Sequence, residues 1–232
     1  GDHRDLHYPL RRQRQMCIRD SIKIASKEKI DFFIVSGDLF DEESSYIRLY
    51  PEIRPLLNNT DYEFIIIAGN HDEKAFGTEA FLGEKVRIIR NLTEPLEYEN
   101  LRFFGFPFRN ITIGEVRNSL RKIKDLSLGD KTNILLFHGE LLDHSFSGSD
   151  FGDEKISYMS ARLSFFENLN LKYVLAGHFH TNFQIYELDS EGFFVYPGSP
   201  ISITKKETGR RSVNLFEIGK PPAQYKINTP YY

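Results

Sequence analysis

Side chains that can bind metal ions follow directly after four apolar runs in this sequence. In three of the four, a glycine immediately precedes the metal-binding side chain. Short runs of β-branched and aromatic residues predict buried strands, which normally end in turn residues. A strand followed by Gly-Asn is often only a turn, but a turn does not explain why the pattern recurs. The runs and the residues that follow them are 32–35 with Asp38, 64–67 with Asn70 and His71, 134–137 with His138, and 173–175 with His178 and His180.

The chemistry that these residue types share is the binding of divalent transition metals. Five of the seven histidines lie in these motifs or in the Asp5-Leu6-His7 start, and packing alone explains five together poorly. Imidazole nitrogens and carboxylate oxygens suit manganese, iron or zinc, and a single cysteine disfavours a thiolate-rich zinc site. Seven ligands are too many for one ion with an open position, so we expect two ions about 3.5–4 Å apart, bridged by Asp38. The ligand-type residues are Asp5, His7, Asp38, Asn70, His138, His178 and His180.

The elements around these motifs predict a mixed α/β layered domain, because strands alternate with helices first and hairpins follow. Ser21 is the expected N-cap of a helix over residues 21–29. Pro51 and Pro55 are expected to kink or split a helix over residues 44–59. The remaining expectations are a hairpin turning at residues 99–100, a helix over 113–126 with Val116, Leu120 and Ile123 inward, a helix over 160–170 capped by Ser160, a hairpin turning at 189–192, and a strand within 210–218.

Length and composition fit one domain over residues 1–232, with residues 219–232 as a surface tail. The single cysteine, Cys17, excludes an internal disulfide and favours a reducing, cytoplasmic compartment. No apolar run approaches the ~18 residues of a membrane span, so no membrane partner is expected. A net charge of −3 and a pI near 6.2 do not indicate a stand-alone nucleic-acid binder.

Five motifs in order resemble the signature of the calcineurin-like metallophosphoesterases, from Asp5 to about Ile218. They are Asp5-Leu6-His7, Gly37-Asp38-Leu39-Phe40-Asp41, Gly69-Asn70-His71-Asp72, Phe137-His138-Gly139 and Gly177-His178-Phe179-His180. Within that superfamily the chain looks most like the SbcD/MRE-type DNA repair nucleases. The less specific pointers are "DFFIVSGDLFD", "LRFFGFPF" and "VYPGSP".

The resemblance implies a four-layer α/β/β/α sandwich with the site at the carboxyl ends of the central strands. It further implies two divalent ions, with manganese the first choice and iron or zinc as alternatives. His71 would be the catalytic imidazole and Asp72 its orienting partner, while Asp41 would fix a ligand. The implied ligands are Asp5, His7, Asp38 and His180 for the first ion, and Asp38, Asn70, His138 and His178 for the second.

The chain departs from the family pattern in two places. Only four residues precede Asp5, so the first strand is expected to be truncated. Residues 10–21 show no periodicity, do not resemble the family, and look like a translated sequencing adapter. Their basic run could also be a nucleic-acid patch.

Three functions therefore stay open. The first is a nuclease-like phosphodiesterase acting on DNA, either as an exonuclease or as an endonuclease, with an SbcC-type ATPase as a possible partner. The second is a phosphoesterase acting on a nucleotide or a phosphoprotein. The third is a metal-poor, non-catalytic scaffold of the same fold.

Overall fold

Two main β-sheets carry the strand ends singled out above. The computed structural model describes residues 18–40, 43–143, 159–180, 183–188, 191–200 and 210–227. The smaller sheet has three parallel strands in the order β1-β2-β3. These strands are β1 (Phe32–Ser36), β2 (Glu63–Ile67) and β3 (Val86–Ile88).

The larger sheet has six strands in the order β4-β5-β6-β7-β9-β8. Its four central strands are parallel, and β4 and β8 pair antiparallel at the two edges. A separate antiparallel pair, β10-β11, completes the described strands. The bounds are β4 (Leu96–Glu97), β5 (Leu101–Phe106), β6 (Thr132–His138), β7 (Tyr173–Gly177), β8 (Gln184–Leu188), β9 (Gly192–Tyr196), β10 (Ser212–Asn214) and β11 (Gln224–Lys226).

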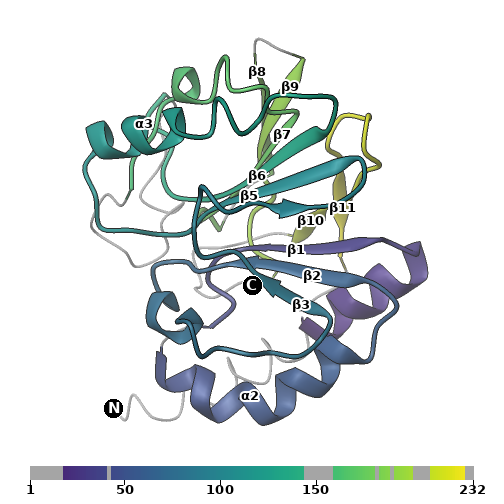
Figure 1. The fold of residues 1–232 in the computed structure, drawn as a ribbon. Coiled ribbons are helices and arrows are strands. Elements are labelled where there is room, and N and C mark those ends of the chain that lie inside the picture. The colour runs from purple at the N-terminus through teal and green to yellow at the C-terminus, as the bar shows by residue number, and fades with distance from the viewer. Residues whose placement is uncertain are drawn as a thin grey trace.

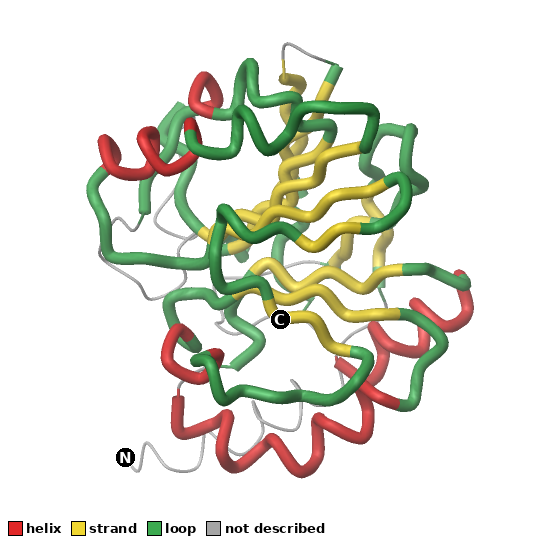
Figure 2. The backbone as a smooth tube through the Cα atoms, in the orientation of Figure 1, coloured by secondary structure: helices red, strands yellow, loops and turns green. Residues whose placement is uncertain are grey.

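Helices lie on the outer sides of the sheets (Figures 1 and 2). A helix over residues 18–28 and α2 (Glu43–Asn58) lie with the three-stranded sheet, and α3 (Ile113–Arg121) lies with the six-stranded sheet. There are also two short 3₁₀ helices: η1 (Glu73–Phe76) follows β2, and η2 (Leu163–Phe165) precedes β7. In the part of the chain that the structure describes, no helix combines the length and the apolar character of a membrane span.

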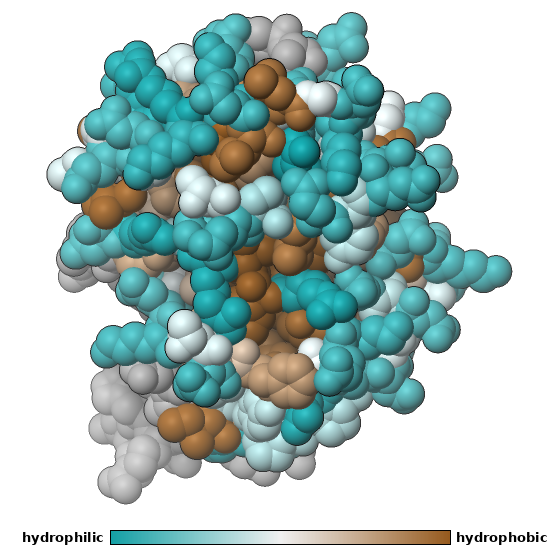
Figure 3. Space-filling view, viewed as in Figure 1, coloured by the Kyte–Doolittle hydropathy of each residue, from teal (hydrophilic) through white to brown (hydrophobic). Residues whose placement is uncertain are grey.

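Three apolar clusters hold these elements together, and β2 contributes to two of them. Ile65 and Ile67 face the six-stranded sheet, whereas Phe64 and Ile66 face α2. Successive side chains of a strand point to opposite faces, so burial of both faces explains the unbroken apolar run of β2. The third cluster joins α3 to the other face of the larger sheet. Apolar residues are also visible near the centre of the face in Figure 3, between the two sheets.

The mixed α/β class is confirmed, and the three clusters are consistent with the layer order expected from the resemblance. The four predicted apolar strands are confirmed as β1, β2, β6 and β7, and both predicted hairpins as β4-β5 and β8-β9. The predicted inward face of α3 is confirmed for Val116 and Leu120, which are fully buried. The helix ends at Arg121 and not at residue 126, and Ile123 is buried just beyond it.

The helix near Ser21 and the helix that contains the two prolines both form, but the predicted Ser21 cap and a split at the prolines are wrong. The first helix already includes Ile18, which packs with Ile22 against the apolar cluster between α2 and the three-stranded sheet. Ser21 therefore lies inside the helix and is not its cap. The apolar spacing therefore extends into residues 18–21, where we expected no periodicity. Pro51 and Pro55 lie within an unbroken α2 on its exposed side, where water can satisfy the carbonyls that lose their partners.

Residues 160–170 form only the short η2 and not the helix that we expected. Ala161 pairs with Leu141 in an isolated parallel bridge, and Arg162 is extended at φ −119° and ψ 151°. The backbone is thus held in an extended conformation where the helix was expected to start. The expected surface tail also contains ordered structure, since β11 pairs with β10 and Ile227 is buried.

The close approach of the two sheets predicts a large effect of Gly105→Ala in β5. A Cβ at Gly105 would lie 2.6 Å from Cβ of Ile89 and 2.8 Å from Cγ2 of Ile67. We expect the free energy of unfolding to fall by about 1–3 kcal/mol, measured by urea denaturation. Gly114→Ala in α3 is the control, because its nearest atom is 4.0 Å away. Equal stability of the two variants would contradict tight packing between the sheets.

Candidate metal centre

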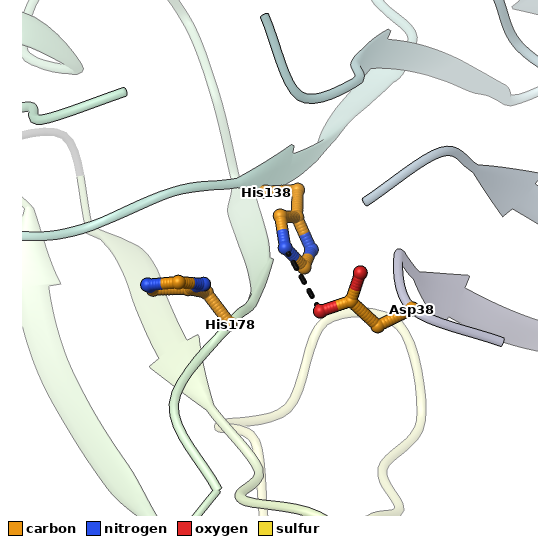
Figure 4. A group of neighbouring side chains, drawn as sticks. All are labelled: Asp38, His138 and His178. Carbon is orange, nitrogen blue, oxygen red and sulfur yellow. Dashed lines mark ion pairs between the residues drawn. The ribbon is translucent and has the colours of Figure 1, made fainter. Parts of the chain in front are cut away.

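Asp38, His138 and His178 converge at the carboxyl ends of strands from both sheets (Figure 4). Asp38 follows β1, His138 ends β6 and His178 follows β7. One ligand atom from each of the three lies within 4.8 Å of the others. His138 and His178 are buried, and their ring centroids are 5.4 Å apart. A group of this size and composition suits a divalent metal ion.

The hydrogen bonds of His138 test whether the site fits a cation. Nδ1 lies 2.7 Å from the carbonyl oxygen of Ser36, which can only accept, so Nδ1 carries a hydrogen. In the neutral ring Nε2 then has only a lone pair. Nε2 nevertheless lies 2.9 Å from Oδ1 of Asn70 and 3.2 Å from Oδ2 of Asp38. Three electron-pair donors that face one another require a proton or a metal ion between them, so these residues fit a bound metal.

The pKa values of the buried groups follow from this arrangement. Burial acts to raise the pKa of Asp38, but the His138 imidazole beside it prevails and the pKa is lowered. Burial likewise acts to lower the pKa of His138, and the neighbouring Asp38 carboxylate outweighs it, so that pKa is raised. For Asp72, burial and then the charge of Asp38 raise the pKa from 3.8 to about 6. The raised pKa of His138 favours a proton on its ring beside the Asp38 carboxylate, and a bound cation would compete with that proton.

The backbone at the site adopts conformations that side chains rarely take. Gly37 has φ +96°, and a Cβ there would collide with the ring of His138. Asp38 has φ 55° and His178 has φ 108°, although neither is a glycine. Backbone strain of this kind persists where the surroundings enforce it and is concentrated at functional sites. Two of the three residues in the close group, Asp38 and His178, thus have strained backbone, which also occurs at five other described non-glycine residues.

The structure brings together four of the expected ligands, counting Asn70 through its contact with His138. His71 lies beside them, since its backbone N–H donates to Oδ1 of Asp38 at 3.0 Å. His180 is described but does not belong to the close group of three. Its backbone carbonyl accepts hydrogen bonds from the guanidinium of Arg211 and from the backbone N–H of Ser199. The other expected residues, Asp5, His7 and Asp41, lie outside the described residues.

Two residues that support the site were missed in the sequence. The carbonyl of Ser36 orients His138, and its hydroxyl donates to the carbonyl of Leu175 at 2.8 Å. Its position before Gly37, at the end of an apolar run, was the available signal. Arg211 is buried and also donates to the carbonyl of Ser199 at 2.9 Å. Nothing in the local sequence distinguishes Arg211 from Arg210.

Comparison with known families agrees with this geometry. A family model described as calcineurin-like phosphoesterase matches residues 5–182. The chain belongs to this family. Members of the family are metal-dependent phosphoesterases, so the fold and the converging ligands now have a common explanation.

Two curated relatives are a nuclease subunit and a DNA repair protein. The SbcD component of the SbcCD nuclease of Staphylococcus epidermidis is 27% identical over 217 residues, which cover 79% of this chain and 54% of the relative. DNA double-strand break repair protein Mre11 of Sulfurisphaera tokodaii is 27% identical over 226 residues, covering 89% and 54% respectively. The chain thus spans about half the length of these relatives. A solved structure matches this chain with a TM-score of 0.50 and 11% sequence identity. The match covers 78% of this chain and 85% of the chain in that structure, and it supports the fold alone.

The raised pKa of His138 predicts pH-dependent metal binding. Below this pKa a proton occupies the ring nitrogen that a metal needs, so affinity for Mn²⁺ should rise with pH until the pKa is passed. Calorimetry in buffers of different ionisation enthalpy should detect release of about one proton per chain near pH 6.5. Affinity that does not change between about pH 6 and pH 8 would contradict this assignment.

Proposed function

We propose that this protein is a dinuclear metal-dependent phosphodiesterase that acts on DNA. The observation that carries the proposal is the convergence of electron-pair donors from Asp38, Asn70 and His138, on two sheets, at one point. Membership of the calcineurin-like phosphoesterases supports hydrolysis of a phosphoester. The nuclease subunit and the DNA repair protein among the chain's relatives favour DNA within that class.

The residues expected to hold the metals are Asp38, Asn70, His138 and His178 for one ion, and Asp38 with His180, Asp5 and His7 for the other. Two divalent ions held there would activate a water molecule and neutralise charge on the phosphoryl oxygens. We propose manganese as the ion that supports the fastest turnover, with iron and zinc as the alternatives that the same oxygen and imidazole ligands accommodate.

Among the protein's own side chains, we propose that His71 takes part in the reaction as a proton donor. The backbone N–H of His71 donates to Oδ1 of Asp38 at 3.0 Å, and His71 directly follows the expected ligand Asn70 in the chain. Both features keep this residue beside the metal site. An imidazole can donate a proton near neutral pH to the oxygen that leaves phosphorus. His71 would then act as a general acid beside the ions and not as one of their ligands.

A smaller phosphoester is the second candidate substrate. The net charge of −3 favours it, because DNA-binding proteins usually present a basic surface. An SbcC-type ATPase partner would supply such a surface and belongs to the DNA proposal. A cytoplasmic location is part of the same proposal.

Activity of the manganese-loaded protein tests both candidates. We expect it to hydrolyse single-stranded or double-stranded DNA as well as a generic phosphodiester, with all activity lost in Asp38→Asn. Metal analysis of both proteins serves as the readout of site integrity. Hydrolysis of nucleotides or phosphopeptides with no cleavage of DNA would favour the second candidate. A protein that binds little metal and hydrolyses no phosphoester would favour the non-catalytic scaffold.

The role of His71 is tested by His71→Asn. We expect the fold and the metal content to be retained and turnover to fall by about 10²–10⁴-fold, as for loss of a general acid. The loss should be smaller for substrates with acidic leaving groups, because these need less protonation. Steady-state kinetics over a series of aryl phosphodiesters measures this difference. A loss of the same size across the series would show that His71 is not the acid.

A further inference from the structure

The loops after β1 and β2 exchange hydrogen bonds through two aspartates. Asp38, in the first loop, accepts from the backbone N–H of His71 in the second, at 3.0 Å. Asp72, in the second loop, accepts from the backbone N–H of Phe40 in the first, at 3.1 Å, and from that of Gly69 at 2.7 Å. Each loop thus holds the backbone of the other through a carboxylate.

We propose that Asp72 is a positioning residue that links the two loops carrying Asp38 and Asn70 and thereby sets the distance between these metal ligands. In this role it acts on the metal site through the backbone and not through the ring of His71. The inference rests on the proposed function for its catalytic consequence, but the link itself is independent of any substrate.

The burial of Asp72 supports this assignment. Its side chain is 0% exposed, and each of its two carboxylate oxygens accepts a backbone N–H. A buried carboxylate is costly unless hydrogen bonds replace water, and bonds to charged groups are stronger than neutral ones. Both carboxylate oxygens therefore already accept hydrogen bonds from the loops. Because the carboxylate is buried, loss of either hydrogen bond would lower the stability of the loops.

A simpler role for Asp72 does not account for these contacts. Asp72 directly precedes η1 at the N-cap position, where aspartate often bonds the first backbone N–H groups of a helix. Its side chain makes no such cap bond. The carboxylate points back to Gly69 and across to Phe40 instead.

The link lies where the sheet can no longer hold the loops. The parallel pairing of β1 with β2 ends at Ser36 and Ile67. Phe40 and Gly69 lie beyond that point, so no ladder bond fixes them to each other. Asp38, between Ser36 and Phe40, has φ 55° and needs an external restraint to stay there. Asp72 provides that restraint.

Asp72→Asn tests the proposal, because the two N–H groups face different carboxylate oxygens, and the amide replaces one of these with an NH2 group that cannot accept a hydrogen bond. We expect affinity for Mn²⁺, measured by calorimetry, to fall about 10–100-fold, as for other residues that orient metal ligands. Turnover should recover at high Mn²⁺, and the remaining loss should be equal for good and poor leaving groups. Amide hydrogen exchange at Phe40 and Gly69 should become faster.

Asn133→Ala is the matched control. The buried amide of Asn133 also joins two backbone segments, at 2.7 Å to Ser127 and 2.9 Å to Asn170, but lies at the start of β6, away from the metal site. This variant should lose stability and keep its Mn²⁺ affinity. An equal loss of affinity in both variants would overturn the proposal, because it would reflect general destabilisation.

Two further results would also overturn it. One is unchanged Mn²⁺ affinity in Asp72→Asn together with a rate loss that grows with leaving-group pKa, the behaviour expected of His71→Asn. The other is rapid exchange of the Phe40 and Gly69 amides in the unmodified protein, a measurement that does not depend on whether the variant folds. If no phosphoester is hydrolysed but affinity and exchange behave as expected, the proposed function fails and the link stands.

Discussion

The hydrogen bond from Nδ1 of His138 to the carbonyl of Ser36 joins the two halves of this molecule at the metal site. Ser36 belongs to the three-stranded sheet and His138 to the six-stranded sheet, and their atoms lie 2.7 Å apart. The Ser36 hydroxyl adds a second bond across the same boundary, to Leu175. Since the candidate ligands come from both sheets, the site exists only while the sheets keep this alignment.

The alignment also explains how the chain tolerates strain at Asp38 and His178. Left-handed backbone at residues of this type costs of order 1–3 kcal/mol each. The cost is offset by packed surroundings, because β7, which leads into His178, is buried between two apolar clusters, and β1, which leads into Asp38, packs partly buried between two clusters. A stiff core thus holds two unfavourable conformations in place, where a loosely packed core would let them relax.

The strands and much of the site could be predicted from the sequence, because apolar runs ending in ligand-type residues are local signals. The continuity of α2 could not, since it depends on which side of the helix Pro51 and Pro55 face. The short η2 could not either, because Ala161 is held by Leu141 from a distant strand end. The orienting role of Ser36 depends on its carbonyl, which every residue possesses, so residue type carries no information about it.

The contact between Ser36 and Leu175 also has a consequence for when the metal site can form during synthesis of the chain. These residues are 139 positions apart. On the ribosome, Asp38 and Asn70 emerge long before the strands that must complete their surroundings. Closing so long a loop is slow and costs chain entropy before any contact repays it. His138 and His178 can join Asp38 only after β6 and β7 have been made, so the close group of three is completed in the second half of synthesis.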